Sequence, residues 1–97
     1  MKPAKLIIKD HEGSTRTYEL RDTETLIGQS GVSHVRLTDP ASSRNHTGIS
    51  WEGDHYLVED LQTTNGTRVN GQRIRSEVLN DGDVIQLGQT SLTFRLL

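Results

Sequence analysis

Short runs of alternating hydrophobic and polar residues, or of β-branched residues, recur along the whole chain. Each run is bounded by turn-forming residues, and no stretch of about ten residues or more has the periodicity of an amphipathic helix. The pattern predicts about ten short strands. They are expected at residues 4–9, 15–20, 25–28, 34–37, 47–51, 55–59, 67–69, 72–74, 84–87 and 91–96. Short strands at roughly even spacing are typical of an all-β sandwich or barrel.

Turns that contain glycine connect most of these runs. Asn70-Gly71 separates two short strands and is the strongest hairpin signal, because both residues tolerate the positive φ angles of a type I′ turn. Residues 52–54 and 88–90 each predict a hairpin with a three-residue loop. We expect residues 1–97 to form a single domain without a linker at either end, as in a small independent protein or a module from a longer one.

Composition limits the partners and the compartment. The formal net charge is −2, so no overall field attracts nucleic acid or an anionic membrane, and a bound anion must be held by a local cluster. The chain has no cysteine, which excludes disulfides and thiolate metal sites and fits a reducing compartment. It shows neither a signal peptide nor an apolar run of the ~18 residues that span a bilayer. We expect a soluble, cytoplasmic protein.

Three polar segments are longer than simple turns, and binding residues usually lie on such loops. They are Gln29–Ser33, Thr38–His46 and Leu61–Gly66. We expect function to reside in these segments, because a β-sandwich gathers its loops at its two ends.

Two of the segments contain the donors that an anion requires. Ser43 and Thr64 have hydroxyl groups, Arg44 has a charged planar fork of donors, and the amide of Asn65 can pair with a peptide backbone. A phosphate group carries a charge of about −1.5 to −2 and three strong acceptor oxygens, which such donors suit. The same residue types also form ordinary solvated turns, so the residues alone leave both interpretations open.

The order of motifs along the chain is similar to that of a known family. Leu26-Ile27-Gly28-Gln29 is followed by Ser43-Arg44-Asn45-His46, then by the segment 60–71 with Thr64-Asn65-Gly66 at its centre, and finally by 79–85. Each piece alone is a weak signal, but all of them in this order resemble the forkhead-associated (FHA) domain, from about Leu6 to the end of the chain.

The resemblance implies an eleven-strand sandwich of two twisted, mainly antiparallel sheets, which binds a phosphothreonine-containing segment of a partner or of its own parent chain. A Ser/Thr kinase would act upstream, and no cofactor, metal, nucleic acid or membrane is implied. By the same resemblance, Ser43 donates to the phosphate, Thr64 is a second contact, Arg44 faces the ligand and Asn65 holds the peptide backbone.

Three further residues look like structural support for the site. By the resemblance, His46 braces the loop that carries Ser43, Gly66 permits the turn after Asn65, and Gly28 belongs to the first motif. These positions are therefore expected to shape the site and not to contact the ligand.

One position departs from the family pattern. An arginine normally follows the glycine of the first motif, but here the residue is Gln29, which keeps a donor and loses the charge and the fork. A lost charged hydrogen bond is worth about 1.5–3 kcal/mol. Either Arg44, with Arg36 or Arg68, compensates and leaves weak phosphate binding, with Gln29 as a further contact or a bystander, or the domain is a phosphate-independent interaction or oligomerisation scaffold.

Catalysis receives little support from the sequence. Ser43, His46 and Asp60 could be arranged as nucleophile, base and orienting acid. However, Ser43 and His46 share one short loop, and no nucleophile elbow accompanies them. The four histidines lack the spacing of a metal site. The sequence therefore predicts a binding module and not an enzyme.

Overall fold

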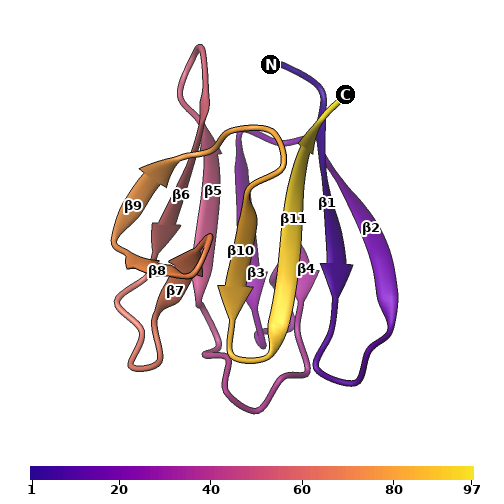
Figure 1. Ribbon diagram of the computed structural model, residues 1–97, viewed down its shortest axis with the longest axis vertical. Helices are drawn as coiled ribbons and strands as arrows, with labels where there is room; N and C mark the ends of the chain where they lie inside the picture. Colours follow the sequence, from indigo (N-terminus) through magenta and orange to yellow (C-terminus); the bar gives the residue numbers. More distant parts are fainter.

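Two β-sheets face each other across a shared hydrophobic core (Figure 1). The computed structural model describes residues 1–97 and contains eleven strands and no helix. The strands are β1 (Ala4–Lys9), β2 (Thr15–Leu20), β3 (Glu24–Gly28), β4 (Val35–Arg36), β5 (Thr47–Trp51), β6 (Tyr56–Asp60), β7 (Thr67–Val69), β8 (Gln72–Ile74), β9 (Ser76–Val78), β10 (Val84–Leu87) and β11 (Thr90–Leu96). None of its elements is a helix of the length and hydrophobicity that a membrane span requires.

The sheets have six and five strands, in the orders β2-β1-β11-β10-β7-β8 and β4-β3-β5-β6-β9. Only β3 and β4 pair in parallel, and every other pairing is antiparallel. The expected all-β sandwich of two mainly antiparallel sheets is therefore confirmed.

The alternating pattern located ten of the strands but missed β9. Its three residues, Ser76, Glu77 and Val78, are all exposed, so the segment has no alternation to reveal it. It adds to the edge of its sheet through β6 alone, where Leu57 faces Val78. An exposed edge strand this short is specified by its partner strand and not by its own sequence.

Most turns lie where the sequence signals place them, but the hairpin loop predicted at residues 52–54 has four residues, 52–55, because Trp51 pairs with Tyr56. Asn70 and Gly71 have φ angles of 51° and 85°, as the predicted type I′ turn requires. The prediction for residues 88–90 was wrong by one residue, because Leu87 pairs with Thr90 and leaves a two-residue turn. Gly88, with φ of 59°, stands first in that turn and supplies the positive angle that a tight hairpin needs.

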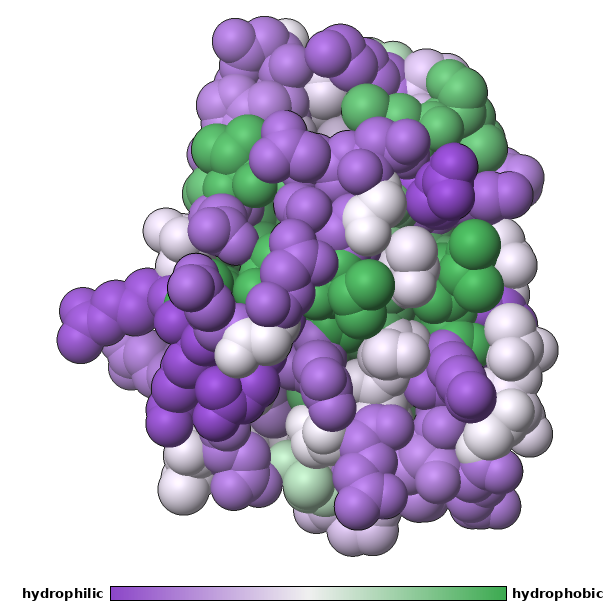
Figure 2. Space-filling model, viewed as in Figure 1, coloured by the Kyte–Doolittle hydropathy of each residue, from purple (hydrophilic) through white to green (hydrophobic).

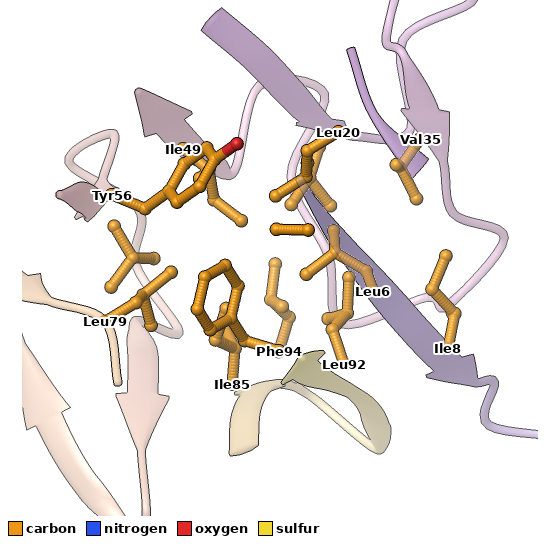
Figure 3. Close-up of a cluster of buried hydrophobic side chains, with 14 of the residues drawn as sticks. Leu6, Ile8, Leu20, Val35, Ile49, Tyr56, Leu79, Ile85, Leu92 and Phe94 are labelled. Atoms are coloured by element: carbon orange, nitrogen blue, oxygen red, sulfur yellow. The ribbon is translucent and has the colours of Figure 1, made fainter. Parts of the chain in front are cut away.

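The core is built from the inward-facing positions of both sheets. Along β1, for example, Leu6 and Ile8 are buried while Ile7 between them is partly exposed. Tyr56 from the five-stranded sheet meets Phe94 from the six-stranded sheet edge to face, with ring centroids 5.4 Å apart, as Figure 3 shows. This aromatic contact joins the two sheets across the middle of the core.

The three polar loops and the chain termini lie at opposite ends of the sandwich. Both termini are at the top of Figure 1, whereas the loops that follow β3, β4 and β6 lie toward the bottom with the β10–β11 turn. We refer to these as the β3–β4 loop (29–34), the β4–β5 loop (37–46), the β6–β7 loop (61–66) and the β10–β11 turn (88–89). The three polar segments found in the sequence therefore share one end of the molecule.

Candidate functional site

The β3–β4 and β4–β5 loops are joined by their backbones beyond the ends of the strands. The N–H of Gln29 donates to the carbonyl of Ser43 over 2.9 Å, and that of Ser30 donates to the carbonyl of Arg44 over 3.0 Å. A side chain at Gly28 would overlap the Arg44 carbonyl and lie 2.9 Å from the Ser43 carbonyl. Only glycine permits this approach, which places Ser43 beside position 29.

A buried imidazole joins the β4–β5 loop to the β6–β7 loop. His46 is 0% exposed, and its Nδ1 accepts the N–H of Ser43 at 2.9 Å. Because Nδ1 is an acceptor, the ring proton is on Nε2, which donates to the carbonyl of Gly66 at 2.8 Å. The backbones of Ser43 and Gly66 are thus one imidazole ring apart, which brings Ser43 and Asn65 to the same site.

The carboxylate of Asp60 holds the β6–β7 loop through hydrogen bonds. Its Oδ1 accepts the hydroxyls of Thr63 at 2.7 Å and Thr67 at 2.8 Å, and its Oδ2 accepts the N–H of Thr63 at 3.1 Å. The Thr63 hydroxyl also accepts the N–H of Gly66 at 2.9 Å. Burial alone would raise the pKa of Asp60, but the hydrogen bonds outweigh it and hold that pKa below its ordinary value.

A second carboxylate, which is buried, holds the β4–β5 loop against the β10–β11 turn. Asp39 is 2% exposed, and its Oδ2 accepts the N–H of Gln89 at 2.9 Å and the hydroxyl of Thr90 at 2.8 Å. Its Oδ1 accepts the N–H of Ala41 at 2.9 Å. Burial would raise the pKa of Asp39, but these hydrogen bonds lower it further than burial raises it. Sequence reasoning missed this residue, because Gln89 and Thr90 lie 50 and 51 residues further along the chain.

The hydrogen bonds of His46, Asp60 and Asp39 form a framework beneath the loops. The predicted ligand-contacting residues gather at the surface over this framework. Ser43 is partly exposed, whereas Arg44, Thr64 and Asn65 are exposed. The amide nitrogen of Asn65 donates to the carbonyl of Ala41 at 2.8 Å, which adds a second link between the two loops. The Asn65 side-chain oxygen, an acceptor, accepts none of the hydrogen bonds that link the loops.

Gln29 is near the other site residues, but its side chain is engaged in the framework. Its Nε2 donates to the carbonyl of Asp39 at 2.7 Å, and the group is partly buried. The guanidinium of Arg36 lies next to it, with Nε donating to the Gln29 carbonyl at 3.1 Å. A charged group is therefore present beside position 29 although the residue itself is neutral.

The comparisons with known proteins agree with this arrangement. The family model of the FHA domain matches residues 25–88. This chain belongs to the FHA domain family. It is 42% identical over 85 residues to the FHA domain-containing protein FhaA of Mycobacterium tuberculosis, a match that covers 88% of this chain and 16% of FhaA. This FHA domain therefore corresponds to a small part of that relative's length.

Two solved structures are also similar. One comes from a structural and functional analysis of phosphothreonine-dependent FHA domain interactions, with a TM-score of 0.88 and 39% identity, covering 98% of this chain and 97% of the other. The second is EmbR of Mycobacterium tuberculosis in complex with a low-affinity phosphopeptide, with a TM-score of 0.85 and 33% identity, covering 95% of this chain and 24% of EmbR.

The geometry of this FHA domain does not form a nucleophile–base pair. His46 contacts the backbone nitrogen of Ser43 and not its hydroxyl, and both ring nitrogens are engaged. Asp60 is 4.0 Å from Nε2 and is bound by the hydroxyls of Thr63 and Thr67 instead. These residues hold the loops in place, as a preformed binding surface requires.

The close approach at Gly28 can be tested by substitution. Gly28→Ala should lower the free energy of unfolding by about 1–3 kcal/mol, because the new methyl group would overlap the backbone of Arg44. Urea unfolding measures the change. Gly31→Ala is the matched control, because nothing lies within 4 Å of the added carbon, and it should change stability by less than about 0.5 kcal/mol. Equal stability of both variants would contradict the packing described.

The two framework carboxylates should make this FHA domain sensitive to acid. Their pKa values are lowered in the folded state, so they stabilise the fold above the ordinary value of 3.8. That contribution is lost as the pH falls through the folded-state values. Urea unfolding between about pH 7 and about pH 3 should show falling stability, with most of the loss below about pH 5.

Asp60→Asn separates this effect from general acid denaturation. The variant should be less stable than the wild type at neutral pH and should lose less stability on acidification, because its amide does not titrate. A variant that loses as much stability on acidification as the wild type would show that Asp60 does not contribute.

Proposed function

We propose that this FHA domain binds phosphothreonine-containing segments of proteins at the loop end of the sandwich. The observation that carries the proposal is the His46 bridge, which holds Ser43 and Asn65 side by side on a preformed surface. The segment would come from a partner or from the parent chain, after phosphorylation by a Ser/Thr kinase. Such signalling would place the protein in the cytoplasm.

Each residue then has a chemical task. The hydroxyls of Ser43 and Thr64 and the guanidinium of Arg44 donate to the phosphate oxygens, while Asn65 pairs with the backbone of the bound segment. The loops are ordered before the ligand arrives, so little conformational entropy is lost on binding. Because the contacts are charged and exposed, the affinity should fall as salt increases.

The comparisons support this function through what is known of the related structures. EmbR was solved with a phosphopeptide, and another neighbour belongs to a study of phosphothreonine-dependent FHA domain interactions. The shared fold and the matching motifs around Ser43 and Asn65 make the same ligand class the best candidate here.

The arginines beside the neutral residue at position 29 support a weaker phosphate site and not its absence. The guanidinium of Arg36 is held against the Gln29 carbonyl, and Arg44 extends from the next loop. We propose that these two arginines supply the positive charge that Gln29 lacks. The alternative is a phosphate-independent interaction or oligomerisation scaffold, and Gln29 is the observation that favours it.

Alanine substitutions test the site directly. Ser43→Ala and Asn65→Ala should each weaken binding of a phosphothreonine peptide by roughly 10-fold or more, because each removes a hydrogen bond to a charged or otherwise unpaired group. Isothermal titration calorimetry with the phosphorylated and unphosphorylated peptides measures the affinities. Ser50→Ala, on a strand away from the loops, should bind like the wild type. Equal affinity for both forms of the peptide would favour the scaffold alternative.

Restoring the family residue at position 29 tests the role of charge. Gln29→Arg should tighten phosphopeptide binding by about 10-fold, as expected of one added charged hydrogen bond. Gln29→Ala is the paired variant. It removes the contact with Asp39, so it should lower stability without tightening binding. If Gln29→Arg leaves the affinity unchanged, position 29 does not reach the phosphate.

A further inference from the structure

We propose that this FHA domain selects ligands with an acidic residue close to the phosphothreonine, through Arg68 and Arg73. The inference rests on the proposed function, because it concerns the part of the ligand that flanks the phosphorylated residue. Three observations carry it: the pairing of the two arginines, the absence of an ion pair to either of them, and a groove that connects Arg68 to Asn65.

The two arginines lie directly opposite each other on neighbouring strands. Arg68 of β7 faces Arg73 of β8 in the register of the hairpin. Thr67 and Val69 on either side of Arg68 are buried, so Arg68 points to the outer face of the six-stranded sheet. Figure 2 shows strongly hydrophilic side chains gathered over this hairpin. Like charges in directly opposed positions destabilise a sheet, so the fold alone does not account for the pair.

No carboxylate neutralises this pair. The ion pairs of the structure involve other residues, and neither Arg68 nor Arg73 takes part in one. Arg73 reaches the carbonyl of Thr64 at 3.3 Å, and Arg68 reaches that of Gly71 at 3.5 Å. Contacts of this length are weak. Most of the donors of both guanidinium groups are thus free, although the chain has 13 acidic residues and only 11 lysines and arginines.

A groove connects Arg68 to Asn65, the proposed peptide-binding residue. It has a volume of about 360 Å³ and lies between the β6–β7 loop and the β10–β11 turn. Asn65 and Ala41 line it next to the site, and Arg68 and Gln86 line it further along. Arg68 is the only charged residue of its lining, and Ala41 the only hydrophobic one. A peptide whose backbone is held by Asn65 would enter this groove, where a carboxylate side chain meets Arg68.

Arg73 extends the positive surface toward the phosphate. Its guanidinium lies over Gly66, whose φ is +81°, and a side chain at Gly66 would be 2.5 Å from the Arg73 Nε. Together with its contact to the Thr64 carbonyl, this places Arg73 against the β6–β7 loop. Arg73 thus lies against the loop, and Arg68, directly opposite it in the hairpin, lines the groove. Two arginines on a chain of net charge −2 are too few for the phosphate backbone of a nucleic acid.

The experiment uses a set of phosphothreonine peptides with alanine at the flanking positions. In each peptide one flanking position, up to about four residues away, carries Asp or Lys. At low ionic strength, Asp at one or two adjacent positions should tighten binding about 2- to 5-fold, as expected of exposed charge pairs, and Lys there should weaken it. The difference should shrink at about 0.15 M salt.

Variants of Arg68 and Arg73 test whether these two residues cause the preference for Asp. Arg68→Gln and Arg73→Gln should each reduce the Asp preference while the all-alanine phosphopeptide still binds, and Arg68→Lys should retain most of it because the charge remains. Arg95→Gln is the matched control, because Arg95 lies on the same sheet and pairs with Asp81. It should leave the preference unchanged.

The outcomes separate this inference from the proposed function. If no phosphothreonine peptide binds, the proposed function is wrong and this inference falls with it. If the peptides bind but Asp and Lys are accepted equally, or if the Asp preference survives in Arg68→Gln combined with Arg73→Gln, only the present inference is overturned. Thermal unfolding of each variant verifies that it is folded, and Arg68→Gln alone is sufficient for the test if the double variant does not fold.

Discussion

The loop end of this FHA domain depends on the hydrogen bonds of one buried histidine. The ring of His46 accepts the N–H of Ser43 on one side and donates to the carbonyl of Gly66 on the other. Both groups are backbone atoms of loops, which have no strand partner to satisfy them. Without the imidazole, each would be left unpaired at a cost of about 1–3 kcal/mol, and the bond from Asn65 to the Ala41 carbonyl would remain as a link between the two loops that carry Ser43 and Asn65.

The electrostatics of the framework and of the surface are separate. Asp39 and Asp60 place two negative charges beneath the loops that are proposed to bind an anion. Their oxygens accept hydrogen bonds from N–H and O–H donors, mostly of the loops. These hydrogen bonds stabilise the ionised form of both carboxylates. The donors offered to a ligand are a different set, on Ser43, Arg44 and Thr64. The carboxylates shape the loops, and the surface groups are the ones proposed to bind.

The sequence predicted those features that depend on neighbouring residues. Alternation located most strands, and Asn70-Gly71 predicted its turn with the right backbone angles. The family motifs placed Ser43 and Asn65 together, which the structure shows through His46. What could not be predicted depends on partners distant in the chain: the bonds of Asp39 to residues 50 and 51 positions away, the engagement of Gln29 by the Asp39 carbonyl, and the exposed strand β9, which only its neighbour specifies.

The position of the two chain ends governs how this domain can be attached to other sequences. β1 and β11 pair along their length, with Ala4 facing Leu96, so both ends emerge together at the pole away from the loops (Figure 1). Sequence joined to either end therefore begins at the pole away from the loops. The molecule is 33 Å along its longest axis, and an extended chain covers about 3.3 Å per residue. A tethered ligand from the same polypeptide must thus be separated from the domain by at least about ten residues.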